Sequence, residues 1–504
     1  MGSLLVLGTT SDAGKSVLVA GLCRWLARRG VRVAPFKAQN MSLNSYVTRA
    51  GAEIGRAQAA QARACGIEPE AVMNPVLLKP GSETGSQLIV LGQAVGEHEA
   101  RQYWSDVQSG LLTVVTDSYR DLASRFEAVI CEGAGSPAEI NLRESDIVNM
   151  GFARAASVPA VLIGDIDRGG VFASFVGTLA VLDPADQRLI AGFVVNKFRG
   201  DKRLLQPGLE MLEAITGRPV AGVLPYVSDI GVDAEDAIDW ALLRSGGPPA
   251  GPDVLRVAVV ALPRMSNHTD VDALAVEPGV VVRFARHAAE LHDADLIIVP
   301  GTRATVADLG WLRERGIDAA IARHATAGRP VLGICGGYQM LGRDIDDPVE
   351  SGAGRVPGLG LLPVRTAFAP RKTLARPSRT LPDGSVVHGY EIHHGLVTRD
   401  GGQPFFADIG CRDDTGAVTG TLWHGLLEND AFRRGYLTEV ARRAGRSFTV
   451  APDTDFDATR EARLDRLADL VAEHLDTSLI DRLLAGRAGP VPVLRLAREP
   501  AAAG

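Results

Sequence analysis

The stretch that most constrains the fold of this 504-residue chain is GTTSDAGKS, residues 8–16. It follows the apolar run Leu4–Leu7 and precedes an apolar helical pattern, so we expect a strand, a polar loop and a helix in succession. Backbone N–H groups of such a loop, together with the helix N-terminus, can cradle phosphates. Lys15 can reach the outer phosphates, and the Ser16 hydroxyl can bind Mg²⁺. The competing interpretation is a strand–turn–helix with a Ser or Asp cap, but G-K-S stands where the helix must begin.

Short apolar strands alternate with helical patterns on both sides of a Gly/Pro-rich stretch, LRSGGPPAGPD. This rhythm is typical of a parallel sheet covered by helices on both faces, which binds ligands at the carboxyl ends of its strands. We therefore predict an α/β protein with two doubly wound domains. The predicted segments are a phosphate-loop domain at 1–242, a linker at 243–252, a second domain at 253–443, and a helical extension at 444–504 whose Pro/Ala/Gly tail is expected to be disordered.

Composition excludes several classes of protein. The net charge of −7 gives no reason to expect nucleic-acid binding. Five scattered cysteines form neither a disulfide framework nor a CxxC zinc pair. The sequence has no secretory signal and no apolar run of about 18 residues, so we expect a cytoplasmic enzyme with small-molecule partners and no membrane contact. Arginine is abundant but lysine occurs only six times, so each lysine marks a candidate site for a compact ammonium.

The glycine of the loop at Gly8 stands one residue earlier than the common G-x-x-x-x-G-K-[ST] pattern requires. The same displaced spacing makes the loop resemble that of the dethiobiotin-synthetase-like ATPases. That resemblance implies ATP binding, with Lys37 in "APFKAQN" as a second phosphate-facing lysine and Asn196 in "VVNKF" near the adenine. Glu132 in "CEGAGS" ends a strand and is expected to hold Mg²⁺ with Ser16, unless it caps a helix. The residues expected to bind ATP are Thr10, Ser11, Asp12, Ala13, Gly14, Lys15, Ser16, Lys37 and Asn196.

A second chemical motif is VLGICGGYQML, residues 331–341, which has the shape of a nucleophile elbow with cysteine in place of serine. Cys335 would lie at a helix N-terminus, where the thiolate form is favoured. The alternative is a buried structural cysteine. The N–H groups of Gly336 and of Gly301, in "VPGTRAT", could form an oxyanion hole.

The thiolate needs a base, and the residues alone leave His393, His394 and His424 open. The motif resembles class I glutamine amidotransferases of the cobyric acid synthase branch, in which the histidine lies in a segment like "GTLWHGLLE". This resemblance selects His424. The wider class has a glutamate two residues after the histidine, but this chain has Leu426 there. The third member of the site therefore stays open between the more distant Glu428 and a Cys–His dyad.

The order of the two motifs resembles the cobyric acid synthase family to about residue 440, with "EGAGSPAEINLRESDIVNMGFA", "DIDRGGVFAS" and "GYEIHHG" as specific stretches. The resemblance implies ATP- and Mg²⁺-dependent amidation of the b, d, e and g carboxylates of adenosylcobyrinic acid a,c-diamide, with L-glutamine as nitrogen donor. Three alternatives are a cobyrinic acid a,c-diamide synthase, a ParA/MinD-like switch ATPase and an inactive scaffold. Asp146, Asp165 and Asp167 are metal, substrate or helix-capping candidates. The sequence does not predict an oligomeric state.

Overall fold

The computed structural model describes residues 2–81, 85–99, 108–227, 253–381, 384–406 and 409–494. The predicted linker at 243–252 and the last residues of the predicted tail, 495–504, lie outside the described residues. Within the described part of the chain, no helix has the length and apolar character needed to cross a membrane.

The N-terminal domain is built on a six-stranded parallel sheet with strand order β12-β11-β10-β1-β9-β2. Its central strands are wholly buried because helices cover both faces, as a parallel sheet requires. The strands are β1 (Ser3–Gly8), β2 (Val33–Phe36), β9 (Ala128–Glu132), β10 (Ala160–Asp165), β11 (Ile190–Phe198) and β12 (Val220–Pro225). The helices are α1 (Lys15–Arg28), α4 (Gln108–Arg125), α5 (Met150–Ala156), α6 (Val171–Val181), α7 (Pro184–Gln187) and α8 (Lys202–Thr216).

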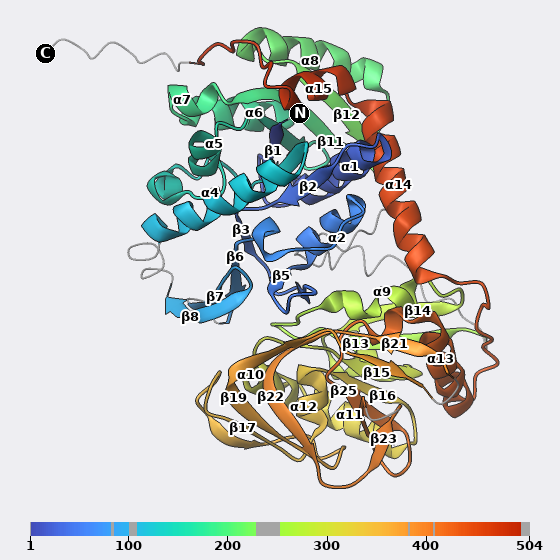
Figure 1. Cartoon of the computed structure of the whole chain (residues 1–504). Coiled ribbons are helices and arrows are strands. Elements are labelled where there is room, and N and C mark those ends of the chain that lie inside the picture. The colour runs from blue at the N-terminus through green and yellow to red at the C-terminus, as the bar shows by residue number, and fades with distance from the viewer. Residues whose placement is uncertain are drawn as a thin grey trace, which may run out of the picture.

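Between β2 and α4 the chain forms a smaller lobe that reaches toward the second domain (Figure 1). Its sheet has the order β3-β6-β7-β8, and a separate hairpin pairs β4 with β5. The elements of this lobe are β3 (Gln39–Met41), β4 (Ser45–Val47), β5 (Glu53–Gly55), α2 (Arg56–Ala64), β6 (Val76–Pro80), β7 (Gly85–Val90) and β8 (Gln93–Glu99).

The second domain has a seven-stranded sheet of order β14-β13-β15-β16-β25-β24-β23, in which the first five strands are parallel. Its strands are β13 (Leu255–Val260), β14 (Val280–Ala285), β15 (Leu296–Val299), β16 (Val331–Ile334), β23 (Gln403–Phe405), β24 (Gly410–Arg412) and β25 (Val418–Thr421). The helices are α9 (Asp272–Ala275), α10 (Thr305–Glu314), α11 (Ile317–Thr326), α12 (Gly336–Leu341) and α13 (Asp430–Ala444). This confirms the prediction of two doubly wound α/β domains.

A mixed sheet of order β18-β17-β19-β22 packs beside this core, and a short hairpin pairs β20 with β21. The strands are β17 (Asp344–Asp347), β18 (Gly354–Pro357), β19 (Val364–Ala375), β20 (Ser378–Thr380), β21 (Val386–His388) and β22 (Glu391–Arg399).

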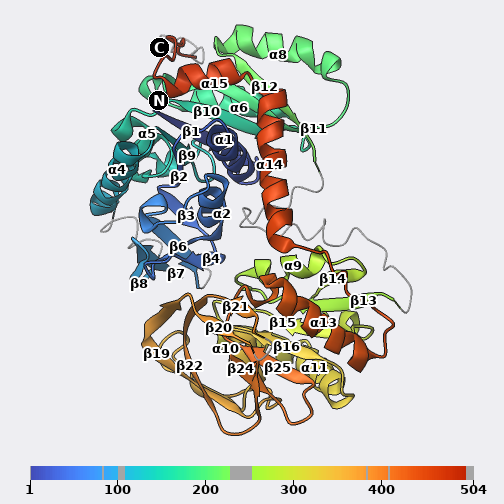
Figure 2. The ribbon, with the colours of Figure 1, turned by 45° about the vertical axis from the view of Figure 1, so that its right-hand side comes forward.

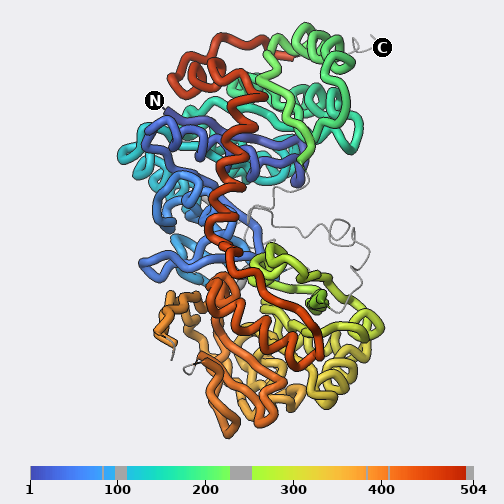
Figure 3. Tube along the Cα trace, turned by 90° about the vertical axis from the view of Figure 1, so that its right-hand side faces the viewer, coloured from blue at the N-terminus to red at the C-terminus, as the bar shows by residue number. Residues whose placement is uncertain are grey.

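The chain returns to the N-terminal domain after α13. Helix α14 (Phe456–His474) packs along α1, and α15 (Thr477–Leu484) contacts β1 and β12. Figures 2 and 3 show α14 as the red helix that runs from the second domain along the first. Arg24 and Arg28 of α1 form ion pairs with Asp465 and Asp469 of α14, at 2.8 and 2.7 Å. The C-terminal segment therefore joins the two domains.

Candidate active sites

The loop at residues 8–14 connects β1 to α1, which begins at Lys15. The ammonium of Lys15 donates hydrogen bonds to the carbonyl oxygens of Thr10 and Ser11, both at 2.9 Å, and of Gly135 at 3.1 Å. The structure also accounts for the displaced glycine. A Cβ at Gly8 would lie 2.7 Å from the Thr10 carbonyl oxygen and 2.8 Å from the Lys15 ammonium, so a side chain there would displace both.

The end of β11 lies against the same loop. The amide of Asn196 donates to the Ala13 carbonyl at 2.9 Å, and a Cβ at Gly14, whose φ is +95°, would overlap that amide. Lys197 donates to the Asp12 carbonyl at 3.0 Å. The structure thus brings Asn196 together with residues 12–14 of the loop.

Glu132, at the end of β9, is the centre of a buried polar cluster. One carboxylate oxygen accepts from the Ser16 hydroxyl and the Lys37 ammonium, both at 2.7 Å, and the other accepts from Gln61 at 2.6 Å. Burial by itself raises the pKa of Glu132, but the Lys37 charge and these hydrogen bonds outweigh it and hold the pKa below its ordinary value. The carboxylate is therefore ionised, and it shares a hydrogen bond with the Ser16 hydroxyl.

This donor set fits a magnesium site of the usual kind, in which one or two protein oxygens bind the ion and phosphates and water complete its shell. No group of three or more His, Cys, Asp or Glu side chains that could hold a metal ion occurs among the described residues. Gln61 is a member of the cluster that the sequence analysis did not predict, because nothing in the composition of α2 distinguishes it from a surface glutamine.

The three aspartates that the sequence left open have structural partners. The carboxylate of Asp146 accepts from the backbone N–H groups of Val148, Asn149 and Gly151 at 2.7 to 2.9 Å, so it ties the turn before α5 to the first turn of that helix. Asp165 pairs with Lys197 at 3.0 Å, and Asp167 pairs with Arg199 at 3.1 Å.

Cys335 lies in a strained turn between β16 and α12, with φ +50° and ψ −109°. The residues around it must be small. A Cβ at Gly337 would overlap the Val299 carbonyl, and one at Gly333 would lie 2.7 Å from Cα of Tyr338. This strand–turn–helix is the geometry of a nucleophile elbow, and the backbone strain is localised on the predicted nucleophile.

His424 is buried beside Cys335, and its Nδ1 lies 2.7 Å from a carboxylate oxygen of Asp270. The second oxygen of Asp270 accepts from the Gly425 N–H at 2.8 Å. Burial lowers the pKa of His424, but the charge of Asp270, followed by the charge and hydrogen bond of Cys335, raises this pKa to about 10. The arrangement therefore favours an imidazolium next to the thiol sulfur.

Asp270 occupies the place of the third member that the sequence left open. Glu428 does not, because its carboxylate is held by Arg56 and Arg460. Asp270 precedes His424 by 154 residues in the chain. An aspartate after a strand is a common turn and cap residue, so "NHTDVD" gave no signal of this role.

The other two histidines have different surroundings. Nδ1 of His394 lies 3.0 Å from the Ala369 carbonyl oxygen, and burial lowers the pKa of His394. Neither ring nitrogen of His393 has a hydrogen-bond partner within the described ranges. Both residues line the pocket that contains Cys335, but His424 is the histidine with the Asp270 pair.

The two glycines expected to form an oxyanion hole lie on neighbouring segments beside this site. A Cβ at Gly301 would lie 2.9 Å from Cε1 of His424, and one at Gly336 would lie 3.1 Å from the backbone nitrogen of Thr302. The turn after β15 and the start of α12 therefore approach each other closely beside the thiol and the imidazole.

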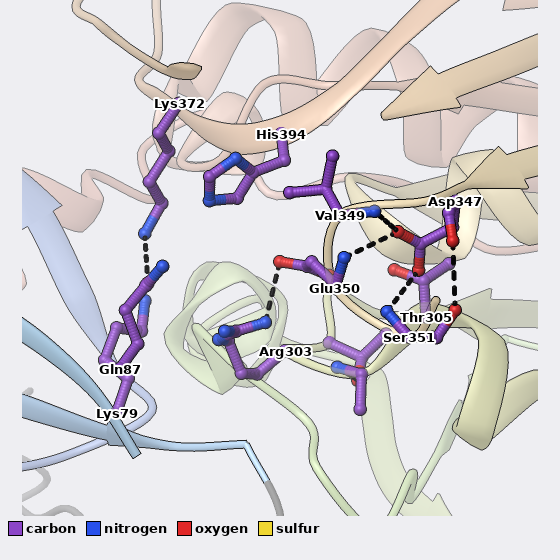
Figure 4. A network of polar contacts seen from close by, with 12 residues as sticks. Lys79, Gln87, Arg303, Thr305, Asp347, Val349, Glu350, Ser351, Lys372 and His394 are labelled. Carbon is purple, nitrogen blue, oxygen red and sulfur yellow. Dashed lines mark hydrogen bonds and ion pairs between the residues drawn. The ribbon is translucent and has the colours of Figure 1, made fainter. Parts of the chain in front are cut away.

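Residues of both domains line the pocket next to Cys335. Lys79 comes from β6 of the N-terminal domain, and Glu53 joins Lys79 to Lys372 through ion pairs of 2.7 and 2.6 Å. Figure 4 shows Lys79 and Lys372 approaching each other from the two domains, and the Arg303–Glu350 pair, at 2.7 Å, on the wall of the second domain. Burial raises the pKa of Glu350 to about 7 and lowers that of Lys372 to about 8. The pocket is polar and is completed by the interface between domains.

Comparisons with known proteins find relatives of both domains. Residues 4–237 match the CobQ/CobB/MinD/ParA nucleotide binding domain, and residues 256–432 match the CobB/CobQ-like glutamine amidotransferase domain. A cobyric acid synthase of Streptomyces coelicolor is 62% identical over 488 residues, which cover 96% of each chain. A cobyric acid synthase of Mycolicibacterium paratuberculosis is 59% identical over 502 residues, covering 98% of this chain and 99% of its own. A solved glutamine amidotransferase aligns with 37% of this chain and 98% of its own, at 22% identity and a TM-score of 0.31.

Proposed function

Because this chain belongs to the cobyric acid synthase family, we propose that it amidates the b, d, e and g carboxylates of adenosylcobyrinic acid a,c-diamide and so forms adenosylcobyric acid. The enzyme is a glutamine-dependent amidoligase of cobalamin biosynthesis. The observation that carries the proposal is the presence of two different catalytic constellations in one chain. These are a phosphate loop with the Ser16–Lys37–Glu132 cluster and a Cys335–His424–Asp270 site.

Glutamine is hydrolysed at Cys335. The thiolate attacks the side-chain carbonyl carbon of glutamine, and the developing oxyanion accepts hydrogen bonds from the N–H groups of Gly336 and Gly301. His424, as imidazolium, gives its proton to the departing nitrogen, so ammonia leaves and a thioester remains. Water then attacks the thioester carbonyl carbon while His424 takes a proton from that water. The C–S bond breaks, glutamate leaves, and the thiolate and the imidazolium are restored.

Asp270 supports each of these proton transfers. Its carboxylate keeps the proton on Nδ1 of His424, so that Nε2 is the nitrogen that exchanges a proton with the thiol, ammonia or water. The same carboxylate stabilises the imidazolium. It holds the segment after His424 as well, through the Gly425 N–H.

The carboxylate of the corrinoid is activated in the N-terminal domain. A carboxylate oxygen attacks the γ-phosphorus of ATP, ADP leaves, and an acyl phosphate forms. Ammonia attacks its carbonyl carbon, and phosphate departs to leave the amide. Lys15 and Lys37 neutralise charge on the phosphates, and loop residues 10–16 donate backbone N–H groups to them. Ser16 and Glu132 would hold Mg²⁺, which supplies further charge neutralisation when bound.

The alternative functions are not favoured. The Cys335–His424–Asp270 site has no use in a ParA/MinD-like switch ATPase. High identity over nearly the whole chain to cobyric acid synthases favours that branch over the cobyrinic acid a,c-diamide synthases. An inactive scaffold has no need of an ionised Glu132 cluster and a strained cysteine in the same chain.

The test is mass spectrometry of the corrinoid after incubation of adenosylcobyrinic acid a,c-diamide with the enzyme, ATP, Mg²⁺ and glutamine. Each acid-to-amide change gives one mass step, so the proposal predicts four steps that all depend on ATP. Cobyrinic acid without its a and c amides serves as the competing substrate. Preferential amidation of cobyrinic acid at its a and c positions would support the diamide synthase instead.

A further inference from the structure

The smaller lobe of the N-terminal domain packs directly on the segment that carries Asp270. The backbone N–H of Ser45 donates to the Asn267 side chain at 2.8 Å, and the N–H of His268 donates to the Asn44 side chain at 3.3 Å. Asn267 and His268 lie three and two residues before Asp270. The hairpin of the N-terminal domain is therefore bonded to the turn that holds the catalytic imidazole.

Tyr390 covers His424 on the same side. Their rings stack with centroids 5.2 Å apart and an interplanar angle of 25°, and each backbone N–H donates to the other residue's carbonyl oxygen, at 3.0 and 2.9 Å. Tyr46 of the N-terminal domain packs on Tyr390, with centroids 5.1 Å apart. The guanidinium carbon of Arg56 lies 5.3 Å from the Tyr46 ring centre and 5.8 Å from that of Tyr390. The tyrosine on the imidazole is thus held by residues of the other domain.

Arg56 also binds the segment after His424. One of its guanidinium nitrogens donates to Glu428 at 2.9 Å, and Arg460 of α14 donates two hydrogen bonds to the same carboxylate, at 2.7 and 2.8 Å. Arg56 is only 4% exposed, so this charge pair is largely removed from water. The Arg56 guanidinium therefore fixes both the ring that covers His424 and the turn that follows His424.

Arg56 is the first residue of α2, and the same helix reaches the nucleotide site. Gln61, five residues later, donates to the second carboxylate oxygen of Glu132 at 2.6 Å. Five helical residues span only about 7.5 Å along the axis. A single short helix therefore has one end at the base of the glutamine site and the other at the proposed magnesium and ATP site.

We propose that Arg56 and Tyr390 are positioning residues for His424, and that α2 couples nucleotide binding at the Ser16–Glu132 cluster to glutamine hydrolysis. This inference rests on the proposed function and adds that nucleotide binding regulates glutamine hydrolysis. A Mg²⁺ ion held by Ser16 and Glu132 would take the place of their hydrogen bond, so the carboxylate that Gln61 holds would readjust when nucleotide binds. A shift of α2 is then transmitted by Arg56 to Tyr390 and Glu428, which flank the imidazole. Couplings between sites commonly amount to about 5- to 150-fold in an equilibrium.

The experiment measures glutamate release from glutamine with and without a Mg²⁺ complex of a non-hydrolysable ATP analogue. The full-length wild type should change kcat at least fivefold with the analogue, as a coupling of about that size predicts, with little change in KM. Arg56→Gln and Gln61→Leu should lose this response. Arg56→Gln should in addition lower kcat with KM nearly unchanged, because a misplaced base impairs the transition state and not glutamine binding.

Arg63→Gln is the matched control. Arg63 lies on the same helix and forms ion pairs with Asp457 and Glu461, at 2.7 and 2.8 Å. Both partners belong to α14, whereas Arg56 binds Glu428 in the segment after His424. This variant should respond to the analogue as the wild type does. Tyr390 provides a second pair of variants. Tyr390→Leu should lose the response to the analogue and lower kcat, as Arg56→Gln does. Tyr390→Phe should respond to the analogue as the wild type does, since the Tyr390 hydroxyl has no hydrogen-bond partner in the described part of the structure.

Two results would overturn the coupling: a wild-type glutaminase rate that ignores the analogue, or an Arg56→Gln variant that responds as fully as the wild type. Neither would affect the proposed function. That function fails on a different result, the absence of ATP-dependent corrinoid amidation by the wild type.

Discussion

Replacing Asp270 with asparagine tests the assignment of the third catalytic member. The Asp270 carboxylate accepts from Nδ1 of His424 at 2.7 Å and from the Gly425 N–H at 2.8 Å. Asparagine can keep the second bond through its carbonyl oxygen, which turns its NH₂ group toward Nδ1. That nitrogen then has to accept, so the proton moves to Nε2, the nitrogen that must receive the thiol proton. The substitution preserves the shape of the site and reverses the tautomer of the base.

The size of the effect follows from burial. His424 and Asp270 are 1% and 3% exposed, so water cannot take the place of the lost carboxylate. The same carboxylate-to-amide change in a Ser–His–Asp triad lowers kcat about 10⁴-fold, so glutamine hydrolysis should fall about 10²- to 10⁴-fold. Synthesis from added ammonia should stay near the wild-type rate, because the corrinoid is activated in the other domain.

The assay compares glutamate release with corrinoid amidation from ammonium chloride, each at saturating ATP and Mg²⁺. Asp272→Asn is the control, since it makes the same change of side chain two residues later, at the start of α9, while the His424 Nδ1 and Gly425 N–H contacts belong to Asp270. Glutamine hydrolysis within tenfold of the wild type in Asp270→Asn would refute the triad and leave a Cys–His dyad.

The remaining predictions concern the pH profile and the nucleotide site. Since the pKa of His424 is raised to about 10, the imidazolium is present below that pH, and glutaminase kcat should fall only as pH rises through about 10. In Asp270→Asn this alkaline limb should move toward neutral pH, and an unmoved limb would count against Asp270 as the cause of the raised pKa. Lys15→Ala should abolish synthesis from both glutamine and ammonia, and near-normal ammonia-dependent synthesis would show that the loop does not bind ATP. Glu132→Gln should raise the Mg²⁺ concentration needed for half-maximal synthesis, a shift that a titration at fixed ATP detects and that a purely structural Glu132 would not produce.

Much of the fold and of the two sites could be predicted from sequence because local patterns carry them. The loop at 8–16 and the elbow at Cys335 each combine an apolar strand, glycines required by close backbone approach, and a helix that begins directly after the turn. The low number of lysines was informative as well. Lys15, Lys37 and Lys79 are buried and bonded at the sites described above, and the side chain of Lys372 is 8% exposed.

The partners from distant parts of the chain could not be predicted. Asp270, Gln61 and Tyr390 acquire their roles from tertiary contacts, and each residue type is common at turns, on helices or in strands. Glu428 shows that a residue close to His424 in the sequence need not contact it in the structure. It lies four residues after His424, but the turn at Leu426–Glu428 directs its carboxylate to Arg56 and Arg460. Similarly, the apolar pattern of α14 predicts a helix without indicating that it packs on α1 of the other domain.

The central claim is that one domain generates ammonia and the other uses it. Cys335→Ser tests this division most directly, because a serine hydroxyl stays protonated near neutral pH and cannot replace the thiolate. The measurement is mass spectrometry of the corrinoid product of this variant, with ATP and Mg²⁺, once with glutamine and once with ammonium chloride. The account predicts no amide from glutamine and the full series of amide steps from ammonia. A folded Cys335→Ser enzyme that forms no amide from either source would contradict it, since the second domain would then take part in the synthetase reaction itself.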